Sequence, residues 1–485
     1  MNTKPMLTAV AAALFSLGAC VSAQAADLST CTTCHSNITK AHAGAAHKDI
    51  ACTSCHSGVD QHLKKVTDRP TVNMDPATCG GCHQAQYKSL YKDDGRAARQ
   101  SKKAPNGPAP DPFFDRALGA HGFTVEHDLP RAHVWMAIDQ FIVDRAFGGR
   151  FEPKDGWLYA TLDGGKSYKV WDVLKDNYPD NNAQKVHKPG TAAAANAVCW
   201  SCKSTDVMMD WAYLGDKVEG AQFSRSSNPV DVVRKVNHAI NCNFCHDPHT
   251  AQPRVVRDAL IDAVTRDDKS VPNVYRDVAA HPTKLDVKDV GVRGFTRKVA
   301  YMDKADSNLM CAQCHVEYIC NPGFDAKTGA KIGFDSRLTN HFPFVNADEI
   351  EQYYDKIGFR DFKHNLTGAA LVKMQHPDTE TYFGSTHDKA GATCATCHMP
   401  KVKDEKTGKM YTVHWATSPR HYMQETCLTC HKDKTAEQMN KAIDAMKGHY
   451  DGKVREAEAR MNDMFNAFEL AIASGVDEKT LDEAR

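Results

Sequence analysis

Sixteen of the eighteen cysteines in this 485-residue chain occur in Cys-x-x-Cys pairs, and each pair is followed directly by a residue that can ligate a metal. In chain order the motifs are Cys31-Thr-Thr-Cys34-His35, Cys52-Thr-Ser-Cys55-His56, Cys79-Gly-Gly-Cys82-His83, Cys199-Trp-Ser-Cys202-Lys203, Cys242-Asn-Phe-Cys245-His246, Cys311-Ala-Gln-Cys314-His315, Cys394-Ala-Thr-Cys397-His398 and Cys427-Leu-Thr-Cys430-His431. Two such thiols can add to the vinyl groups of a haem, while the adjacent imidazole ligates its iron.

Structural zinc sites are the alternative use of paired cysteines. Two features argue against zinc: histidine follows seven of the eight pairs, and the N-terminus carries an export signal that would send free thiols to an oxidising compartment. The sequence therefore predicts eight covalently bound c-type haems. A core filled by haem also suits a chain with only 42% hydrophobic and 8% aromatic residues.

Seventeen of the 24 histidines lie outside the motifs and can supply second axial ligands to the haem irons. A single histidine is more often a surface or hydrogen-bonded residue, but the surplus as a group indicates mostly bis-histidine, electron-carrying haems. For the three N-terminal haems we predict His47, His62 and His121 as distal ligands, with His42 and His238 as rivals.

The fourth motif differs, because Lys203 stands where the others have histidine. A drifted residue on a five-coordinate structural haem is one reading, yet an amine must lose its proton before it can bind iron. The one irregular haem is therefore the candidate substrate site, and the other seven would carry electrons to it.

The N-terminal 25 residues combine Lys4, an apolar stretch and Ala23-Gln24-Ala25, which predicts a Sec signal peptide cleaved before Ala26. Leu17-Gly18-Ala19-Cys20 also fits a lipoprotein box, in which lipidated Cys20 would tether the chain to a membrane. With 60 basic and 60 acidic residues, the chain gives no reason to expect a nucleic acid partner.

We predict four segments: the signal peptide (1–25), an N-terminal three-haem domain (26–120), a five-haem catalytic domain (121–432) and a C-terminal helical region (433–485). The fold class is mainly α, a multihaem cytochrome c with a haem-filled core, short helices and loops. Apolar residues recur at helical spacing from Thr435 to Ser474, which predicts long amphipathic helices that suit a homo-oligomer interface. Val476-Asp477 resembles the start of a further helix, so a truncated C-terminus is one expectation.

One Cys-x-x-Cys-Lys motif followed by four Cys-x-x-Cys-His motifs resembles the ammonia-forming cytochrome c nitrite reductases over about residues 125 to 470. The three additional N-terminal motifs make the chain most similar to the octahaem members. Cys311-Ala-Gln-Cys314-His315-Val316-Glu317-Tyr318, Lys373-Met374-Gln375-His376-Pro377 and His398-Met399-Pro400-Lys401 carry the resemblance.

The resemblance implies a distal haem face lined by an arginine, a tyrosine and a histidine, which are Arg145, Tyr318 and His376 here, with Arg131 and Arg150 as rivals for the arginine. Such a trio suits nitrite, an anion whose oxygens must be protonated as the N–O bonds break. Without the motifs, ordinary packing or propionate pairing would be the better reading of these residues.

The resemblance also implies a calcium ion held by Glu317 and Gln375, with the backbone carbonyls of Tyr318 and Lys373. Tyr318-Ile319-Cys320 matches the octahaem enzymes, in which the tyrosine and cysteine are joined by a thioether. The distal ligands of the regular haems in the catalytic module would be His133, His364, His387 and His414.

The implied activity is a periplasmic six-electron reduction of nitrite to ammonium, fed by a periplasmic or membrane quinol-linked donor, with hydroxylamine, nitric oxide and sulfite as further substrates. The alternatives are an electron-transfer cytochrome without turnover and an octahaem sulfite or tetrathionate reductase. Hydroxylamine oxidation fits less well, because octahaem enzymes with that activity lack a lysine motif.

Overall fold

The computed structural model describes residues 28–90, 196–228, 231–232, 235, 238–266, 284–292, 294–320, 322–363 and 367–485. These residues form two compact units. The first consists of residues up to Met74 together with His249–Ala251, and the second contains the other described residues. The third Cys-x-x-Cys-His motif therefore lies in the second unit. The predicted domain boundary near residue 120 lies outside the described residues and stays a prediction.

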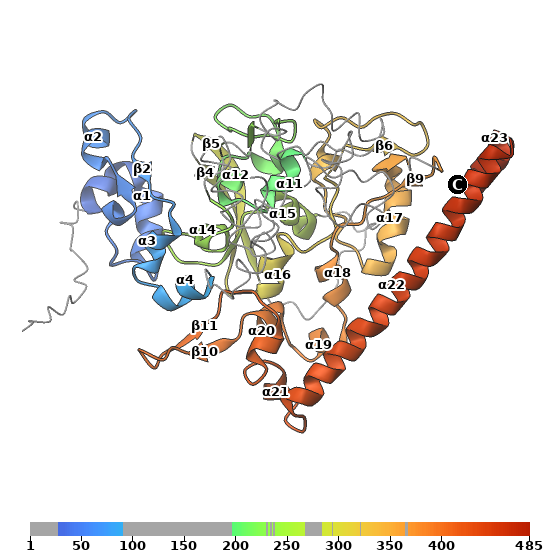
Figure 1. The fold of residues 1–485 in the computed structure, drawn as a ribbon. Helices are drawn as coiled ribbons and strands as arrows, with labels where there is room; N and C mark the ends of the chain where they lie inside the picture. The colour runs from blue at the N-terminus through green and yellow to red at the C-terminus, as the bar shows by residue number, and fades with distance from the viewer. Residues whose placement is uncertain are drawn as a thin grey trace, which may run out of the picture. The chain divides into compact units, whose positions relative to one another are not determined.

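The first unit is built from short elements around the first two motifs (Figure 1). They are α1 (Leu28–Ala43), the 3₁₀ helix η1 (Cys52–Ser54), β1 (His56–Ser57), α2 (Val59–Lys64) and β2 (Thr71–Val72). β1 and β2 pair antiparallel, with His56 opposite Val72, and the Asn73 amide donates to the Cys55 carbonyl at 2.8 Å. This small hairpin fixes the backbone on both sides of the second motif.

The second unit is mainly helical, and most of its helices span two turns or fewer (Figure 1). Its helices are α3 (Pro76–Gly80), α4 (Gln84–Leu90), α11 (Ala197–Ser201), α12 (Thr205–Met209), η5 (Tyr213–Gly215), α14 (Cys242–Cys245), α15 (Asp258–Thr265), α16 (Ser307–Ala312), η6 (Arg337–Asn340), η7 (Ala347–Glu349), α17 (Ile350–Ile357), α18 (Asp378–Tyr382), α19 (Thr386–Lys389), α20 (Cys394–His398), η8 (Pro419–Tyr422), α21 (Cys427–Cys430), α22 (Ala436–Ala473) and α23 (Glu478–Ala484). The predicted fold class, mainly α with short helices and loops, is confirmed.

The cysteine motifs themselves nucleate short helices, because one turn places residues i and i+3 on the same side. In four motifs the amide of the histidine closes this turn on the carbonyl of the first cysteine at 2.9 Å. These four histidines are His83, His246, His315 and His431. Polar caps start several of these turns: the side chain of Asn241 caps α14, and Thr393 forms a capping box with Thr396 on α20.

A three-stranded antiparallel sheet of order β3-β5-β4 is the main feature that the sequence pattern did not predict. It consists of β3 (Arg254–Val255), β4 (Leu285–Val292) and β5 (Phe295–Met302), and β4 and β5 pair over eight residues. The period-two pattern of β5 is hidden because an inward position is a charged residue, Arg297, which is 1% exposed. Its guanidinium is satisfied by backbone carbonyls, including those of Met208 and Val256.

The remaining strands are short and lie in two-stranded ladders. They are β6 (Phe324–Asp325) with β7 (Phe359–Arg360), β8 (Phe362–Lys363) with β9 (Ala370–Leu371), and β10 (Lys401–Lys403) with β11 (Met410–Thr412). A buried cluster that includes Ile319, Ile350, Tyr354 and Phe359 packs the segment after the sixth motif against α17. This cluster fixes the backbone that follows Tyr318.

The predicted C-terminal helix is confirmed as α22, a single helix of 38 residues, followed by α23 (Figure 1). Thr435 and Gln438 form a capping box at the start of α22, and the Asp477 side chain accepts from the Thr480 amide at 3.0 Å to begin α23. In the described part of the chain, no helix is both long enough and apolar enough to cross a membrane.

Candidate active site

The fourth motif, Cys199-Trp-Ser-Cys202-Lys203, which we call the lysine motif, is enclosed by protein on all sides. Every residue of α11 is buried, and Lys203, just beyond it, is 5% exposed. The Asn196 side chain starts the helix by accepting from the Val198 amide at 3.0 Å. The Lys203 amine donates to the Cys199 carbonyl at 3.0 Å, and its backbone amide bonds the Trp200 carbonyl instead. The first cysteine's carbonyl, which takes the histidine amide in four other motifs, here takes the amine.

Tyr318 and His376 come together from two distant segments, as the resemblance implies for a catalytic pair. Their ring centres are 5.7 Å apart, and Tyr318 is 4% exposed. The His376 Nδ1 is buried and has no hydrogen-bond partner among the described residues. Burial lowers the pKa of His376, which lies near Lys203, whereas burial raises the pKa of Tyr318. The imidazole is therefore neutral at neutral pH and the phenol holds its proton.

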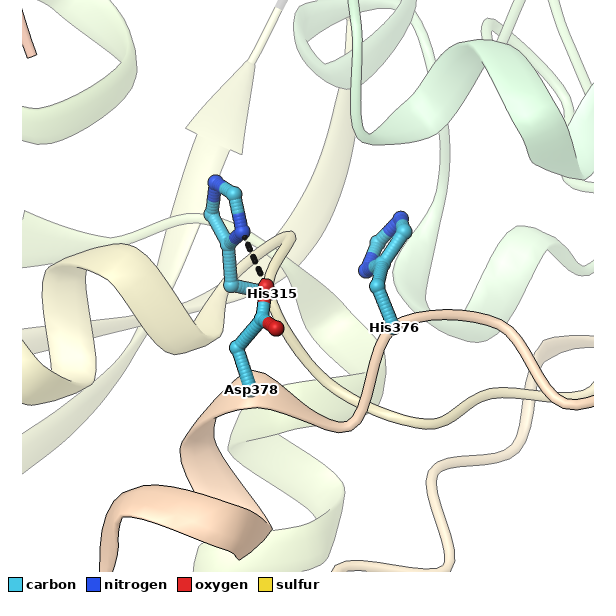
Figure 2. A group of neighbouring side chains, drawn as sticks. All are labelled: His315, His376 and Asp378. Carbon is cyan, nitrogen blue, oxygen red and sulfur yellow. Dashed lines mark hydrogen bonds and ion pairs between the residues drawn. The ribbon is translucent and has the colours of Figure 1, made fainter. Parts of the chain in front are cut away.

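His315, His376 and Asp378 form a group whose candidate ligand atoms lie within 4.8 Å of one another (Figure 2). The His315 Nδ1 is 2.8 Å from an Asp378 carboxylate oxygen, and this hydrogen bond raises the pKa of His315 and lowers that of Asp378. Because Nδ1 donates to the carboxylate, the other ring nitrogen is left to ligate a metal. Asp378 was not predicted, although it lies two residues after His376 at the start of α18.

The predicted calcium ligands Glu317 and Gln375 lie together, next in sequence to Tyr318 and His376. Glu317 is fully buried, and its carboxylate accepts from the Tyr354 hydroxyl at 2.6 Å and from the Gln375 amide at 2.7 Å. The structure thus brings the Glu317 and Gln375 segments into direct contact. Carboxylate, amide and carbonyl oxygens are the donors that calcium prefers.

Two further buried carboxylates, Glu380 and Asp361, surround this cluster and were not predicted from the sequence. Glu380 accepts from the Glu317 amide at 3.0 Å, and Asp361 accepts from the Lys373 amide at 2.6 Å. Burial raises the pKa of Glu317 to about 7, that of Asp361 to about 7 and that of Glu380 to about 8. One Glu380 oxygen is buried with no partner among the described residues. A bound cation would compensate this charge, so the residues fit calcium.

Cys320 is 1% exposed. Its sulfur accepts from the Lys373 amine at 3.3 Å and from the Gln375 side-chain amide at 3.4 Å. It lies between the calcium ligands and the first cysteine of the lysine motif, with which its thiol interacts. The thioether to Tyr318 stays a prediction.

Arg257 is a second buried cation beside the lysine motif, and no local sequence pattern points to it. Its side chain is fully buried, its Nε donates to the Cys202 sulfur at 3.2 Å, and its guanidinium pairs with Asp258 at 2.5 Å. One of its terminal nitrogens has no partner among the described residues. Arg257 therefore holds fixed positive charge next to the site that would take an anion.

Several histidines are already held in the tautomer that iron ligation requires. The Nδ1 atoms of His62, His398 and His414 lie 3.0, 2.9 and 2.8 Å from backbone carbonyl oxygens. A carbonyl oxygen can only accept, so each Nδ1 donates its proton and each Nε2 keeps its lone pair. In addition, the Ser89 hydroxyl accepts from the His414 amide at 2.9 Å, which attaches His414 to the helix after the third motif.

Two pairs of predicted ligands face each other at the spacing of a bis-histidine haem. A histidine nitrogen binds iron at about 2 Å and its ring centre lies about 1 Å farther out, so two ligands on one iron have ring centres roughly 6 Å apart. The ring centres of His35 and His62 are 6.2 Å apart, and those of His387 and His431 are 6.3 Å apart. These residues fit the first and eighth haems.

The other predicted ligands in the described part of the chain have different surroundings. His47 lies half-buried beyond α1. His42 is buried, and its Nδ1 has no hydrogen-bond partner in the described part of the chain. His238 lies 2.9 Å from an Asp206 carboxylate oxygen. The remaining predictions, for Arg131, Arg145, Arg150, His121, His133 and His364, lie outside the described residues.

Known proteins resemble more than half of the chain. Cytochrome c-552 of Haemophilus influenzae strain 86-028NP is 30% identical over 336 residues, which cover 66% of this chain and 52% of that protein. The cytochrome c nitrite reductase subunit NrfA of Nitratidesulfovibrio vulgaris strain Hildenborough is 28% identical, over 58% of this chain and 47% of that protein. The chain thus spans about half the length of the curated relatives it matches.

A solved structure, the cytochrome c nitrite reductase of Desulfovibrio desulfuricans, covers 82% of this chain and 70% of its own, at 22% identity and a TM-score of 0.39. The cytochrome c552 family matches residues 156–485, which include the lysine motif and the four histidine motifs after it. The first three motifs lie before the match. The chain therefore belongs to the cytochrome c552 family.

Proposed function

We propose that this protein is an ammonia-forming nitrite reductase whose substrate binds at a c-type haem ligated by Lys203. The observation that carries the proposal is the convergence of a fully enclosed lysine motif with the Tyr318–His376 pair, whose ring centres are 5.7 Å apart. An electron carrier needs neither a buried amine ligand nor a neutral imidazole with an unused nitrogen. NrfA of Nitratidesulfovibrio vulgaris is a nitrite reductase by name, and Tyr318 and His376 lie in the stretch that matches the family.

The eight motifs would hold eight covalent haems, seven of them ligated by two histidines. When bound, the haem at the lysine motif supplies an iron that binds nitrite and delivers electrons to it. Reduction of nitrite to ammonium consumes six electrons and eight protons and releases two water molecules. The residues of the chain must therefore bind an anion and supply protons.

Lys203 would act as a neutral amine that occupies one face of the iron and leaves the other face to substrate. Iron ligation itself requires the neutral form, because the lone pair of the amine binds the metal. The bond from the Lys203 amine to the Cys199 carbonyl fixes the direction of the side chain. Since the whole of α11 is buried, the ligand cannot swing into solvent.

His376 and Tyr318 would hold and pass protons at the opposite face. The lowered pKa of His376 leaves an imidazole that can take a proton from solvent and give it to a nitrite oxygen, through its Nδ1 or Nε2. The raised pKa of Tyr318 keeps the phenol as a hydrogen-bond donor to the same oxygens. Arg145 is our proposed anion-binding guanidinium, and Arg257 adds a fixed charge nearby.

Calcium would be held by Glu317 and Gln375, with the carbonyls of Tyr318 and Lys373, and balanced by Glu380 and Asp361. Its role would be structural, because these ligands flank both catalytic residues in the sequence. Its positive charge would also favour an anionic substrate.

The predicted N-terminal signal would send this activity to the periplasm, with electrons from a periplasmic or membrane quinol-linked donor. Self-association would use α22, whose exposed apolar residues include Met446, Val454, Met461 and Leu470. Hydroxylamine, nitric oxide and sulfite would be further substrates of the same open iron site.

The test is anaerobic nitrite consumption by the purified holoprotein with reduced viologen, in which ammonium is counted against electrons. We expect about six electrons per ammonium and no released intermediate. A fully haem-loaded sample that nitrite does not oxidise would refute the proposal and favour an electron carrier. Faster turnover of sulfite or tetrathionate than of nitrite would instead identify the neighbouring reductase activity.

A further inference from the structure

The first unit contains two histidine motifs, and only the first of them has a partner among the distal ligands predicted from the sequence. His35 faces His62 at 6.2 Å between ring centres. His56, the histidine of the second motif, faces a residue that sequence reasoning did not single out. Its ring centre lies 6.2 Å from that of His249, and the two rings are nearly parallel, with 13° between their planes.

We infer that His249 is the distal axial ligand of the haem attached at Cys52 and Cys55, opposite His56. The distance equals that of the His35–His62 pair and matches the roughly 6 Å expected for two imidazoles on one iron. This inference rests on the proposed haem attachment but not on the nitrite reductase activity.

His249 lies at the tip of a tight loop whose base is firmly fixed. The Asp247 amide donates to the Gln252 carbonyl at 2.9 Å, and His246 and Pro253 form an antiparallel bridge around the same loop. The Asp247 side chain pairs with Arg254 at 3.1 Å, and both side chains are only 8% exposed. The Gln252 side chain adds a bond to the Met302 carbonyl at 3.1 Å.

The loop also holds a strained backbone conformation. Ala251 adopts a φ of 61°, in the left-handed region that residues other than glycine rarely occupy. Such a conformation persists where the surrounding structure enforces it, commonly at ligand sites. The paired base and the strained turn together restrict the backbone of His249, which belongs with His56 to the first unit.

The opposite ligand is equally well placed. His56 begins β1 and pairs with Val72, and the Cys55 carbonyl accepts from the Asn73 amide at 2.8 Å. Both imidazoles are half-buried. A consequence is that residues 28–74 alone do not complete the second haem site, because its distal ligand is contributed three residues after His246 in the sequence.

The inference is tested on the full-length holoprotein with His249→Ala and a matched His449→Ala variant, because His449 is exposed on helix α22 and is not a predicted ligand. Intact mass counts the attached haems, and electron paramagnetic resonance of the oxidised protein counts high-spin irons. We expect His249→Ala to keep all haems and to gain one high-spin haem per chain, and added imidazole to return that haem to low spin. His449→Ala should show neither change.

Unchanged spin states in fully loaded His249→Ala, or the same new high-spin haem in His449→Ala, would overturn the assignment. If the alanine variant loses a haem, His249→Met decides: thioether ligation should keep that iron low-spin and raise the potential of one haem, and unchanged potentials would refute the inference. A wild-type protein that fails to reduce nitrite leaves these results interpretable, whereas a mass without haem at Cys52 and Cys55 refutes the attachment itself.

Discussion

Helix α11, which carries the first cysteine of the lysine motif, is buried along its whole length, whereas α20 and α21, which carry the seventh and eighth motifs, have no buried residue. The backbone differs as well. The His431 amide bonds the carbonyl of Cys427, while the carbonyl of Cys199 receives the side-chain amine of Lys203. The polypeptide therefore encloses the lysine motif by itself and leaves the seventh and eighth motifs partly exposed.

Specific hydrogen bonds hold the lysine motif in its buried position. The Cys202 sulfur donates to the Gln313 carbonyl and accepts from the Arg257 guanidinium, and the Gln313 side chain accepts from the amides of Val256 and Arg257. The sixth motif is thus joined to the lysine motif through Gln313. We infer that a substrate site needs surroundings that are fixed before substrate binds, whereas an electron-carrying site needs chiefly its two axial ligands.

Exchanging the fifth residue between the two kinds of motif should have the largest effect. Lys203→His is expected to lower nitrite-dependent viologen oxidation by about 100-fold, because an imidazole cannot reproduce the amine ligand and its bond to the Cys199 carbonyl in an enclosed site. The matched change His431→Lys, at an exposed motif, should cost less than about tenfold. Equal losses of nitrite-dependent activity in the two variants, each with its full haem content by mass, would contradict the proposed difference between the two kinds of motif.

Removal of the proton donor should rank next. His376→Gln is expected to lower nitrite turnover by roughly 100-fold with unchanged spectra, because a carboxamide cannot exchange protons near neutral pH. Tyr318→Phe, which removes the phenol, should act in the same direction. His449→Gln on the exposed helix α22 serves as the control and should retain wild-type turnover. A fully active His376→Gln variant would remove this residue from the mechanism.

Calcium removal should act mainly on the surroundings of the lysine motif. The folded state raises the pKa of Glu317 from 4.5 to about 7 and that of Glu380 from 4.5 to about 8. At a pH between the unfolded and folded pKa values, the folded protein holds protons that the unfolded chain has released. The free energy of unfolding in chelator therefore falls as pH rises from about 5 to about 8. The expected loss is a few kcal/mol, since one pKa unit corresponds to about 1.4 kcal/mol.

Added calcium should reverse that loss, and the reversal should be largest at the high-pH end. Calorimetric melting curves at pH 5.5 and 8.0, with chelator and with calcium, measure both effects. Melting temperatures in chelator that do not depend on pH, or that calcium leaves unchanged, would contradict a cation site at Glu317.

The smallest effect is expected at the eighth motif, whose helix α21 has no buried residue. His387→Met replaces the partner of His431, whose ring centre lies 6.3 Å away. Because a thioether still completes the iron coordination, one haem potential should rise while nitrite turnover falls by less than about tenfold. Potentiometric titration followed by optical absorption measures the first effect. A loss as large as that of Lys203→His would show that the exposed haems are not replaceable carriers.

Local signals in the sequence predicted much of the site. The cysteine motifs, Lys203 and the helical spacing of α22 are each recognisable from a few neighbouring residues. His62 and His387, which were predicted as distal ligands, lie opposite His35 and His431. Tyr318 and His376, which the resemblance paired, lie side by side. These features depend on contacts that motifs encode directly.

The residues that were missed act through long-range contacts that leave no local pattern. Arg257 and Glu380 become important only because folding buries their charges beside Cys202 and Glu317. His249 gains its partner from a motif nearly two hundred positions earlier in the chain. The β4–β5 hairpin was hidden because Arg297 occupies an inward position that a period-two pattern reserves for apolar residues.

The most direct test of the central claim is a titration of the oxidised holoprotein with nitrite, followed by optical absorption and electron paramagnetic resonance. An open iron face opposite Lys203 predicts one high-spin haem per chain that becomes low-spin as a single equivalent of nitrite binds. A protein whose haems are all low-spin and do not respond to nitrite would contradict the account and would be an electron carrier.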